Sequence, residues 1–217
     1  MTSTIAASVT PLDTARRMQT RDGETEPITD EALMLAYGRG DSRAFDALYA
    51  RHKGGTYRYF LRHANGDAAT ADELHQDLWM RVIGARSRYE SHAKFSTWLY
   101  TLARHRMVDH WRARHDVSLA SLDDDDIVSE AEDSLDASRA RHADDPMLAT
   151  IDAQTRTRFI VALADVPPLQ RDAFLLHIEG GFTLTEIASL TAASNETVKS
   201  RLRYAYRRLR AALEDLQ

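Results

Sequence analysis

The residues best suited to chemistry in this chain lie on one face of a predicted helix that begins after Ser194. At about 100° per residue, this face is polar and cationic and comprises Glu196, Lys199, Ser200, Arg203 and Arg207, with Arg210 at its edge. The opposite face is apolar and comprises Val198, Leu202, Ala205 and Leu209. Such a helix suits the DNA major groove, where its first turns read base edges and later cations neutralise phosphates. A Lys/Arg-rich face is also common on solvated helices, so the neighbouring residues must decide between the two.

The residues before this helix predict a shorter helix and a tight turn. Thr183 or Thr185 can cap the short helix, because a threonine hydroxyl accepts from free amide groups. Its apolar residues recur at helical spacing and are Leu184, Ile187, Ala188 and Leu190. The turn falls at residues 191–193, and Ser194 can cap the cationic helix. A short helix, a turn and a cationic helix together form a helix-turn-helix pattern, which favours DNA binding.

A second candidate site lies at a basic loop, residues 86–94, and the predicted helix that follows it, residues 95–114. The apolar side of this helix comprises Phe95, Trp98, Leu99 and Leu102, and the opposite side comprises Thr97, Thr101, Arg104, His105 and Arg112. Aromatic rings that stack on bases, beside cations that follow phosphates, can hold single-stranded nucleic acid. Trp98 is predicted to be a core residue, whereas Tyr89 and Trp111 could either stack on bases or pack inside the fold.

The predicted helix over residues 70–86 has an inner stripe of Leu74, Leu78 and Val82. Its other side is polar and acidic and carries Glu73, Gln76, Asp77 and an exposed Met80. Such a face can dock a partner protein or be an ordinary solvated surface.

Metal and thiol chemistry find little support in the sequence. The chain has no cysteine, which excludes disulfides and thiolate zinc sites. The nine histidines show no HExxH spacing. Four adjacent aspartates, Asp123 to Asp126, cannot converge on one ion from a regular element, so they do not predict a metal site.

The charge distribution divides the chain into blocks. The 217 residues carry a net charge of −5, which does not suggest a nucleic-acid binder. However, residues 116–145 hold 11 acidic and 2 basic side chains, whereas residues 31–115 hold 14 basic and 9 acidic ones. Two neutral-to-basic blocks are therefore joined by an acidic segment, and the local charge matters more than the total. No apolar run approaches the roughly 20 residues of a membrane span, and no secretory signal is apparent at the start.

The expected architecture is all-α, with two helical domains and no strand-like alternation. We expect a mobile extension at residues 1–28, a four-helix domain at 29–115, a flexible acidic linker at 116–145 and a helix-turn-helix domain at 146–217. Within the first domain, Gly54-Gly55 is expected to interrupt or weaken the second helix, and Asn65-Gly66-Asp67 is a predicted turn. In the last block, Val166-Pro167-Pro168 ends one predicted helix and Gly180-Gly181 closes the next.

Two segments together resemble the sigma-70 superfamily of bacterial transcription initiation factors, specifically its small two-domain extracytoplasmic-function (ECF) group. Residues 71–112, ADELHQDLWMRVIGARSRYESHAKFSTWLYTLARHRMVDHWR, resemble region 2 of that family. Residues 166–171, VPPLQR, followed by FTLTEIASLTAASNETVKSRLRYAYRRLR, resemble region 4. The resemblance covers about residues 31–112 and 147–213, and both segments in this order are more specific than either alone. The chain departs from the family pattern at Tyr204 and Tyr206 and in a 191–193 turn without glycine.

The resemblance implies a role for each candidate face. Contacts with the core RNA polymerase are implied for Asp72, Glu73, Gln76, Asp77 and Arg81. Opening and reading of the −10 promoter element, with a flipped base held by the loop, is implied for Tyr89, Ser91, His92, Lys94, Ser96, Thr97, Arg104, His105 and Arg112. Reading of the −35 element as duplex is implied for Thr183, Asn195, Glu196, Thr197, Lys199, Ser200, Arg201 and Arg203, with Arg207 on phosphate.

The resemblance also implies partners and a location. It implies a cytoplasmic, non-enzymatic factor without a cofactor, which binds the beta and beta′ subunits of core RNA polymerase and promoter DNA and is restrained by an anti-sigma protein. In this family the linker occupies a basic channel of the polymerase, so the acidic segment could mimic nucleic acid, or it could simply keep a tether soluble. Two other classes remain open, a stand-alone helix-turn-helix regulator and, less favoured, a metal-dependent nucleic-acid enzyme.

Overall fold

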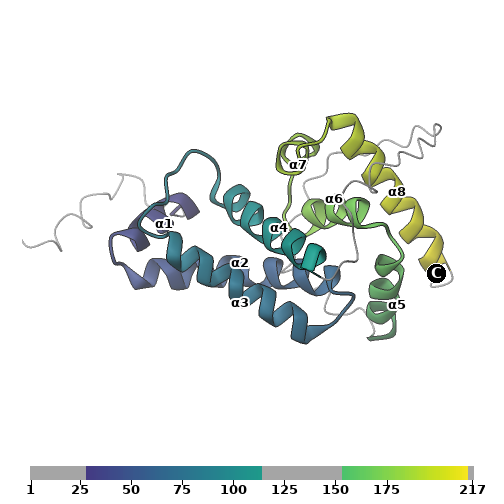
Figure 1. Cartoon of the computed structure of the whole chain (residues 1–217), viewed down its shortest axis with the longest axis horizontal. Coiled ribbons are helices and arrows are strands. Elements are labelled where there is room, and N and C mark those ends of the chain that lie inside the picture. Colours follow the sequence, from purple (N-terminus) through teal and green to yellow (C-terminus); the bar gives the residue numbers. More distant parts are fainter. Residues whose placement is uncertain (1–27, 114–152, 215–217) are drawn as a thin grey trace, which may run out of the picture.

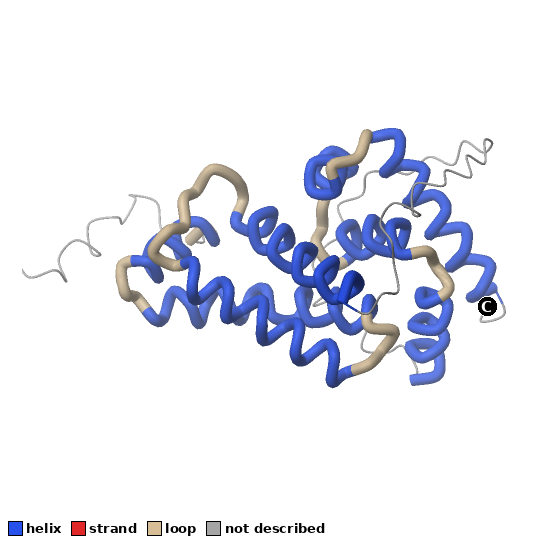
Figure 2. Tube along the Cα trace, in the orientation of Figure 1, coloured by secondary structure: helices blue, strands red, loops and turns tan. Residues whose placement is uncertain are grey.

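A computed structural model describes residues 28–113 and 153–214, and within these ranges every regular element is an α-helix (Figures 1 and 2). The predicted N-terminal extension and acidic linker, including Asp123 to Asp126, lie outside the described residues. No helix in the two described ranges is long and apolar enough to cross a membrane. The all-α prediction is confirmed for the part of the chain that the structure describes.

The first four helices form one bundle. They are α1 (Asp30–Gly38), α2 (Ser42–His63), α3 (Ala68–Ala85) and α4 (Phe95–Ala113). Side-chain oxygens of Thr29, Asp41 and Asp67 accept from amide groups at the starts of α1, α2 and α3, as helix caps do. The predicted inner stripe of α3 is buried, and Asn65 and Gly66 adopt the positive φ values of a turn.

The predicted break at Gly54-Gly55 is wrong, because α2 runs through both glycines without interruption. Packing explains why glycine is tolerated there. A β-carbon at Gly55 would lie 3.0 Å from the hydroxyl of Tyr100 and 3.3 Å from the carbonyl oxygen of Glu179. Gly55 therefore lets α4 and the end of α6 approach α2 closely, and this packing offsets the cost of glycine within a helix.

The last four helices are α5 (Ala153–Ala164), α6 (Pro168–Ile178), α7 (Leu184–Thr191) and α8 (Asn195–Leu213). α7 begins with a capping box, in which Thr183 accepts from the amide of Glu186 and the Glu186 carboxylate accepts from the amide of Thr183. The turn before α8 places Ala192 in the left-handed region, with φ 53° and ψ 36°. Ser194 caps α8, as predicted.

The two bundles pack against each other. α6 contacts α2, α5 contacts α2, and α7 contacts α4, so one buried apolar cluster extends from α1 to α8 (Figure 1). The rings of Tyr100 from α4 and Phe182 from the α6–α7 segment meet edge to face, with centroids 5.2 Å apart. The face of α4 that lies toward α6 and α7 is therefore partly covered by the second bundle.

Candidate nucleic-acid and polymerase interface

The cationic face of α8 is built as the periodicity predicts. Val198, Leu202, Ala205 and Leu209 are all buried, which fixes the rotation of the helix about its axis. The rest of the helix surface carries exposed or partly exposed polar residues, of which Glu196, Thr197, Lys199, Ser200, Arg203 and Arg207 lie away from the buried stripe. Asn195 and Arg201 instead flank the stripe, so the structure places six of the predicted duplex-reading residues of α8 on its polar side. Thr183 is exposed at the start of α7.

The two tyrosines of α8 have different roles. Tyr206 is half-buried, and its ring lies edge to face with Phe174 of α6 at 5.2 Å, so it packs α8 onto α6. The guanidinium of Arg207 lies 5.6 Å from the centre of the Tyr204 ring. The departure from the family pattern at Tyr206 thus serves internal packing rather than the cationic face.

The loop before α4 turns its aromatic residue inward. Tyr89 is buried, with its ring 5.1 Å from that of Trp98 and 6.2 Å from that of Phe95. Burial raises the pKa of its hydroxyl, and the negative charge of Glu31 adds to the effect. In this arrangement Tyr89 is a packing residue, whereas Ser91 and His92 of the same loop are exposed. Trp98 contributes to the core, as predicted, and Trp111 is half-buried against His63.

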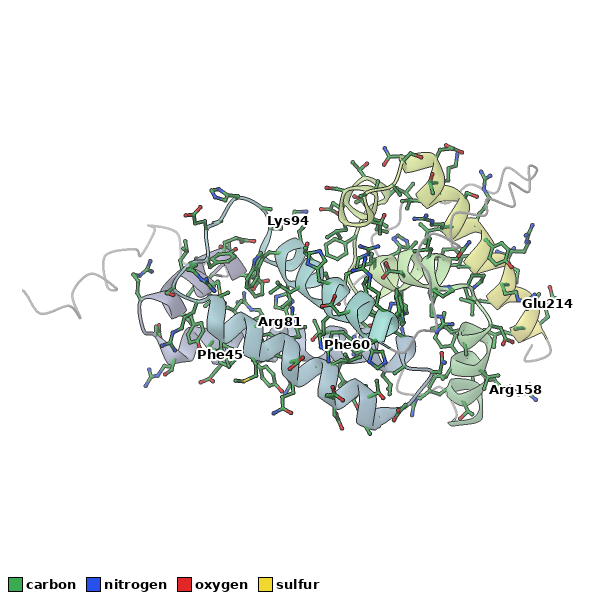
Figure 3. The ribbon with its side chains drawn as sticks, in the orientation of Figure 1. Phe45, Phe60, Arg81, Lys94, Arg158 and Glu214 are labelled. Atoms are coloured by element: carbon green, nitrogen blue, oxygen red, sulfur yellow. The ribbon has the colours of Figure 1, made fainter. Side chains whose placement is uncertain are left out.

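The outer face of α4 is divided between solvent and the second bundle. His105 and Arg112 are exposed, and Ser96 and Thr97 are partly exposed. Arg104, in contrast, donates from Nε to a carboxylate oxygen of Asp172 at 2.8 Å, and its side chain is 16% exposed. The Lys94 ammonium, at the start of α4 (Figure 3), lies 2.9 Å from the Glu186 carboxylate of α7. Two predicted −10 cations therefore have carboxylate partners from the second bundle.

Asp172 is the centre of a buried polar cluster between the bundles. Its side chain is 1% exposed, and besides Arg104 it accepts from the hydroxyl of Tyr59 at 2.8 Å. Burial alone would raise the pKa of Asp172, but His63 and Arg104 outweigh burial and hold the pKa below its usual value. The carboxylate is therefore charged, and the side-chain contacts described for it all come from α2 and α4.

His63 lies beside this carboxylate without a good hydrogen bond. Its Nε2 is 3.5 Å from the nearer oxygen of Asp172, and neither ring nitrogen has a hydrogen-bond partner among the described residues. Its ring packs edge to face on Tyr59 and Trp111. Burial lowers the pKa of His63, and the charges of Arg171 and Arg104 act in the same direction against the pull of Asp172.

Two more charged side chains, Arg171 of α6 and Glu179 at its C-cap, join α6 to the first bundle. Glu179, also buried, pairs with Arg58 at 2.8 Å and with Arg62, both from α2, while its carbonyl accepts from the Tyr100 hydroxyl at 2.9 Å. Arg171 donates to the Asn65 side chain at 2.7 Å and to carbonyl groups at the end of α5. Sequence reasoning missed these residues, because Arg171 and Glu179 look like ordinary surface charges of an amphipathic helix.

The acidic face of α3 is exposed but not free of internal contacts. Arg106 of α4 donates to Asp77 at 2.6 Å and to Glu73 at 3.3 Å. Asp72, Gln76 and Arg81 are exposed, and so is Met80, 59% of whose surface is accessible. The predicted polymerase-contacting residues thus share one side of α3, and the exposed methionine is confirmed. In the described ranges no group of His, Asp and Glu has the arrangement of a metal site.

Comparisons with known proteins agree with this geometry. The family described as sigma-70 region 2 matches residues 48–116, and the family described as sigma-70, region 4 matches residues 156–209. The RNA polymerase sigma factor CarQ of Myxococcus xanthus is 29% identical over 184 residues, which are 85% of this chain and 97% of CarQ. The ECF RNA polymerase sigma factor SigL of Mycobacterium tuberculosis is 31% identical over 176 residues, 78% of this chain and 89% of SigL.

Two solved structures share the fold. CnrH, in complex with the cytosolic domain of CnrY, aligns with a TM-score of 0.56 and 21% identity, covering 86% of this chain and 97% of CnrH. The sigma factor RpoE from Bartonella quintana, in complex with the anti-sigma factor NepR, aligns with a TM-score of 0.58 and 22% identity, covering 79% of this chain and 98% of RpoE. With both sigma-70 regions present in order, the chain belongs to the ECF group of RNA polymerase sigma factors.

Proposed function

We propose that this chain binds core RNA polymerase through α3 and directs initiation at specific promoters through α4 and α8. The observation that carries the proposal is the presence of exposed polar faces on α3 and α4 within sigma-70 region 2 and on α8 within region 4. In this assignment α8 reads the −35 element as duplex, while the 86–94 loop and the outer face of α4 hold the opened −10 element. The chain supplies recognition and strand separation, whereas bond formation belongs to the polymerase.

The polymerase-binding role of α3 rests on its exposed surface. Asp72, Gln76, Arg81 and Met80 present charge and a flexible apolar side chain on one side of the helix, as docking surfaces commonly do. The Arg106 ion pairs orient Asp77 and Glu73 on that same surface. We place the chain in the bacterial cytoplasm with its polymerase, and an anti-sigma protein is the regulator that fits best, as NepR is for RpoE of Bartonella quintana.

Run-off transcription with purified core polymerase on genomic fragments tests the proposal. A sigma factor gives discrete products that depend on both components, and the start sites reveal the promoter. A stand-alone regulator, the alternative class, would instead bind its DNA equally well without polymerase. Specific DNA binding that is unaffected by core polymerase, with no run-off product, would therefore refute the assignment.

A further inference from the structure

The amino-terminal end of α4 has no suitable capping side chain of its own. The residue before Phe95 is Lys94, whose side chain offers no hydrogen-bond acceptor. Its positive charge is also unfavourable at the positive end of a helix dipole. The ammonium group of Lys94 is directed instead to Glu186 on α7, 2.9 Å away. The free amide groups at the start of α4 must therefore be satisfied by water or by an acceptor from another part of the fold.

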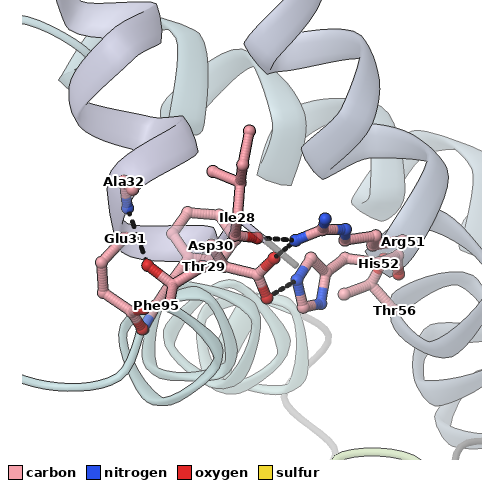
Figure 4. A network of polar contacts seen from close by, with 9 residues as sticks. All are labelled: Ile28, Thr29, Asp30, Glu31, Ala32, Arg51, His52, Thr56 and Phe95. Carbon is pink, nitrogen blue, oxygen red and sulfur yellow. Dashed lines mark hydrogen bonds and ion pairs between the residues drawn. The ribbon is translucent and has the colours of Figure 1, made fainter. Parts of the chain in front are cut away.

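Glu31 of α1 provides that acceptor. Its carboxylate oxygen accepts a hydrogen bond from the backbone amide of Phe95 at 2.6 Å, across 64 residues of sequence (Figure 4). The contact is partly buried, and it brings a negative charge to the positive end of α4. Glu31 thus acts as an N-terminal cap supplied by a different helix.

The residues next to Glu31 are bound to α2. The neighbouring Asp30 pairs with Arg51 at 2.6 Å and with His52 at 2.7 Å, both from α2, and Arg51 also donates to the Ile28 carbonyl at 2.8 Å (Figure 4). Burial would raise the pKa of Asp30, but these two partners outweigh it and lower the pKa. The start of α1 is therefore anchored to α2 on one side and to α4 on the other.

The capped end of α4 is where the 86–94 loop joins the helix. Phe95, whose amide Glu31 binds, packs its ring against those of Tyr89 and Trp98, with centroids 6.2 Å and 5.6 Å away. Ser96 and Thr97, assigned above to the −10 element, form the first turn directly after the capped amide. Glu31 therefore contacts α4 at the point where the loop and this turn meet.

We propose that Glu31 is a positioning residue for promoter opening. It acts through the Phe95 amide, fixing the first turn of α4 and the adjoining loop in the orientation that receives the displaced DNA strand. This inference rests on the proposed function of the −10 face, and Glu31 itself does not contact DNA. A template that is already unpaired over the −10 element removes the step that Glu31 assists.

The test compares holoenzymes on a duplex promoter, identified with the wild-type chain, and on the same promoter unpaired over its −10 element. Formation of the transcribing complex is followed by the onset of abortive RNA synthesis, which can be measured on both templates. Glu31→Ala should slow opening of the duplex about fivefold, the factor corresponding to a typical cap loss of about 1 kcal/mol. Glu31→Gln, which retains an acceptor but loses the negative charge, should slow it about twofold. Both variants should match the wild type on the unpaired template, and Asp46→Ala, at an exposed carboxylate of α2, should match it on both.

The outcomes separate the two proposals. If the wild-type chain gives no run-off product with core polymerase, the proposed function fails. If the wild type is active and Glu31→Ala opens the duplex at the same rate, only the role of Glu31 fails. An equal loss on both templates also overturns that role, because it places the defect in folding or polymerase binding. If Glu31→Ala does not fold, the comparison of Glu31→Gln on the two templates decides, and equal rates relative to the wild type on both would refute the inference.

Discussion

Replacing Asp172 should separate the two helical bundles while leaving each one folded. Its described side-chain partners, Tyr59, His63 and Arg104, all belong to the first bundle. Removing one partner of a buried ion pair typically costs about 3–5 kcal/mol, because the remaining charge stays buried without compensation. The Tyr59 hydroxyl, fully buried here, would also lose its acceptor. For Asp172→Ala we therefore expect about 4 kcal/mol, which shifts the ratio of packed to separated forms roughly a thousandfold.

Electron paramagnetic resonance can measure this separation, since a chain without cysteine accepts two unique labels. Ala93→Cys and Ser189→Cys place spin labels beside the Lys94–Glu186 contact, on exposed positions of the loop and of α7. The labelled parent should give a short, narrow distance distribution, and adding Asp172→Ala should make it longer and broader. Asp109→Ala, at an exposed carboxylate of α4, serves as the matched control. Unchanged distances in Asp172→Ala, with helix content preserved by circular dichroism, would refute the reasoning.

Three further predictions concern His63, Ala192 and Arg207. Burial lowers the pKa of His63, so its contribution to stability is complete above the unfolded value of about 6.5 and is lost as the pH falls below it. The melting temperature of His63→Phe should therefore fall less between pH 7.5 and pH 5.5 than that of the wild type. Ala192→Gly should raise the free energy of unfolding in urea by about 0.5–1 kcal/mol, because Ala192 adopts a left-handed conformation that glycine tolerates. Arg207→Ala should weaken holoenzyme binding at the −35 element and reduce the salt slope by about 1, whereas Arg208→Ala should not.

Each of these has a result that would contradict it. A His63→Phe chain with the same acid sensitivity as the wild type would mean that other groups, such as the partly buried His75, dominate the pH dependence. Destabilisation by Ala192→Gly would mean that the greater freedom of glycine in the unfolded chain outweighs the relief at this turn. Equal effects of Arg207→Ala and Arg208→Ala, both exposed on α8, would show that position on the helix does not matter and that the cationic face is misassigned.

Local features of the fold could be predicted from the sequence because they depend on near neighbours. The buried stripe of α8 follows from helical periodicity, and the caps at Thr183 and Ser194 follow from residue type and position. The same reasoning was wrong at Gly54-Gly55. There, a propensity argument predicted a break, but the close approach of α4 and the end of α6 favours a continuous helix. Helix propensity is a weak predictor wherever tertiary packing specifies the backbone.

Contacts between the bundles could not be predicted in the same way. Arg104 and Asp172 are 68 residues apart, and Arg62 and Glu179 are 117 apart, with a predicted linker between them. Periodicity shows which face of a helix is polar, but not which distant polar face it meets. Tyr89 illustrates the same limit. A tyrosine at this position could either stack on a base or pack inside the fold, and the structure shows its ring packed against those of Phe95 and Trp98.

The contacts between the bundles and the proposed promoter contacts compete for the same cations. Arg104 donates from Nε to Asp172, which holds its guanidinium against α6, and Lys94 has a carboxylate partner in Glu186. The two pairs differ greatly in strength. The side chain of Lys94 is 71% exposed, so its pair contributes at most about 1 kcal/mol and is screened by salt. Arg104 is instead held by a carboxylate that is buried and charged. If α4 receives the −10 strand, separating Arg104 from Asp172 is therefore the costly step, and binding to polymerase must offset that cost before this arginine can contact DNA.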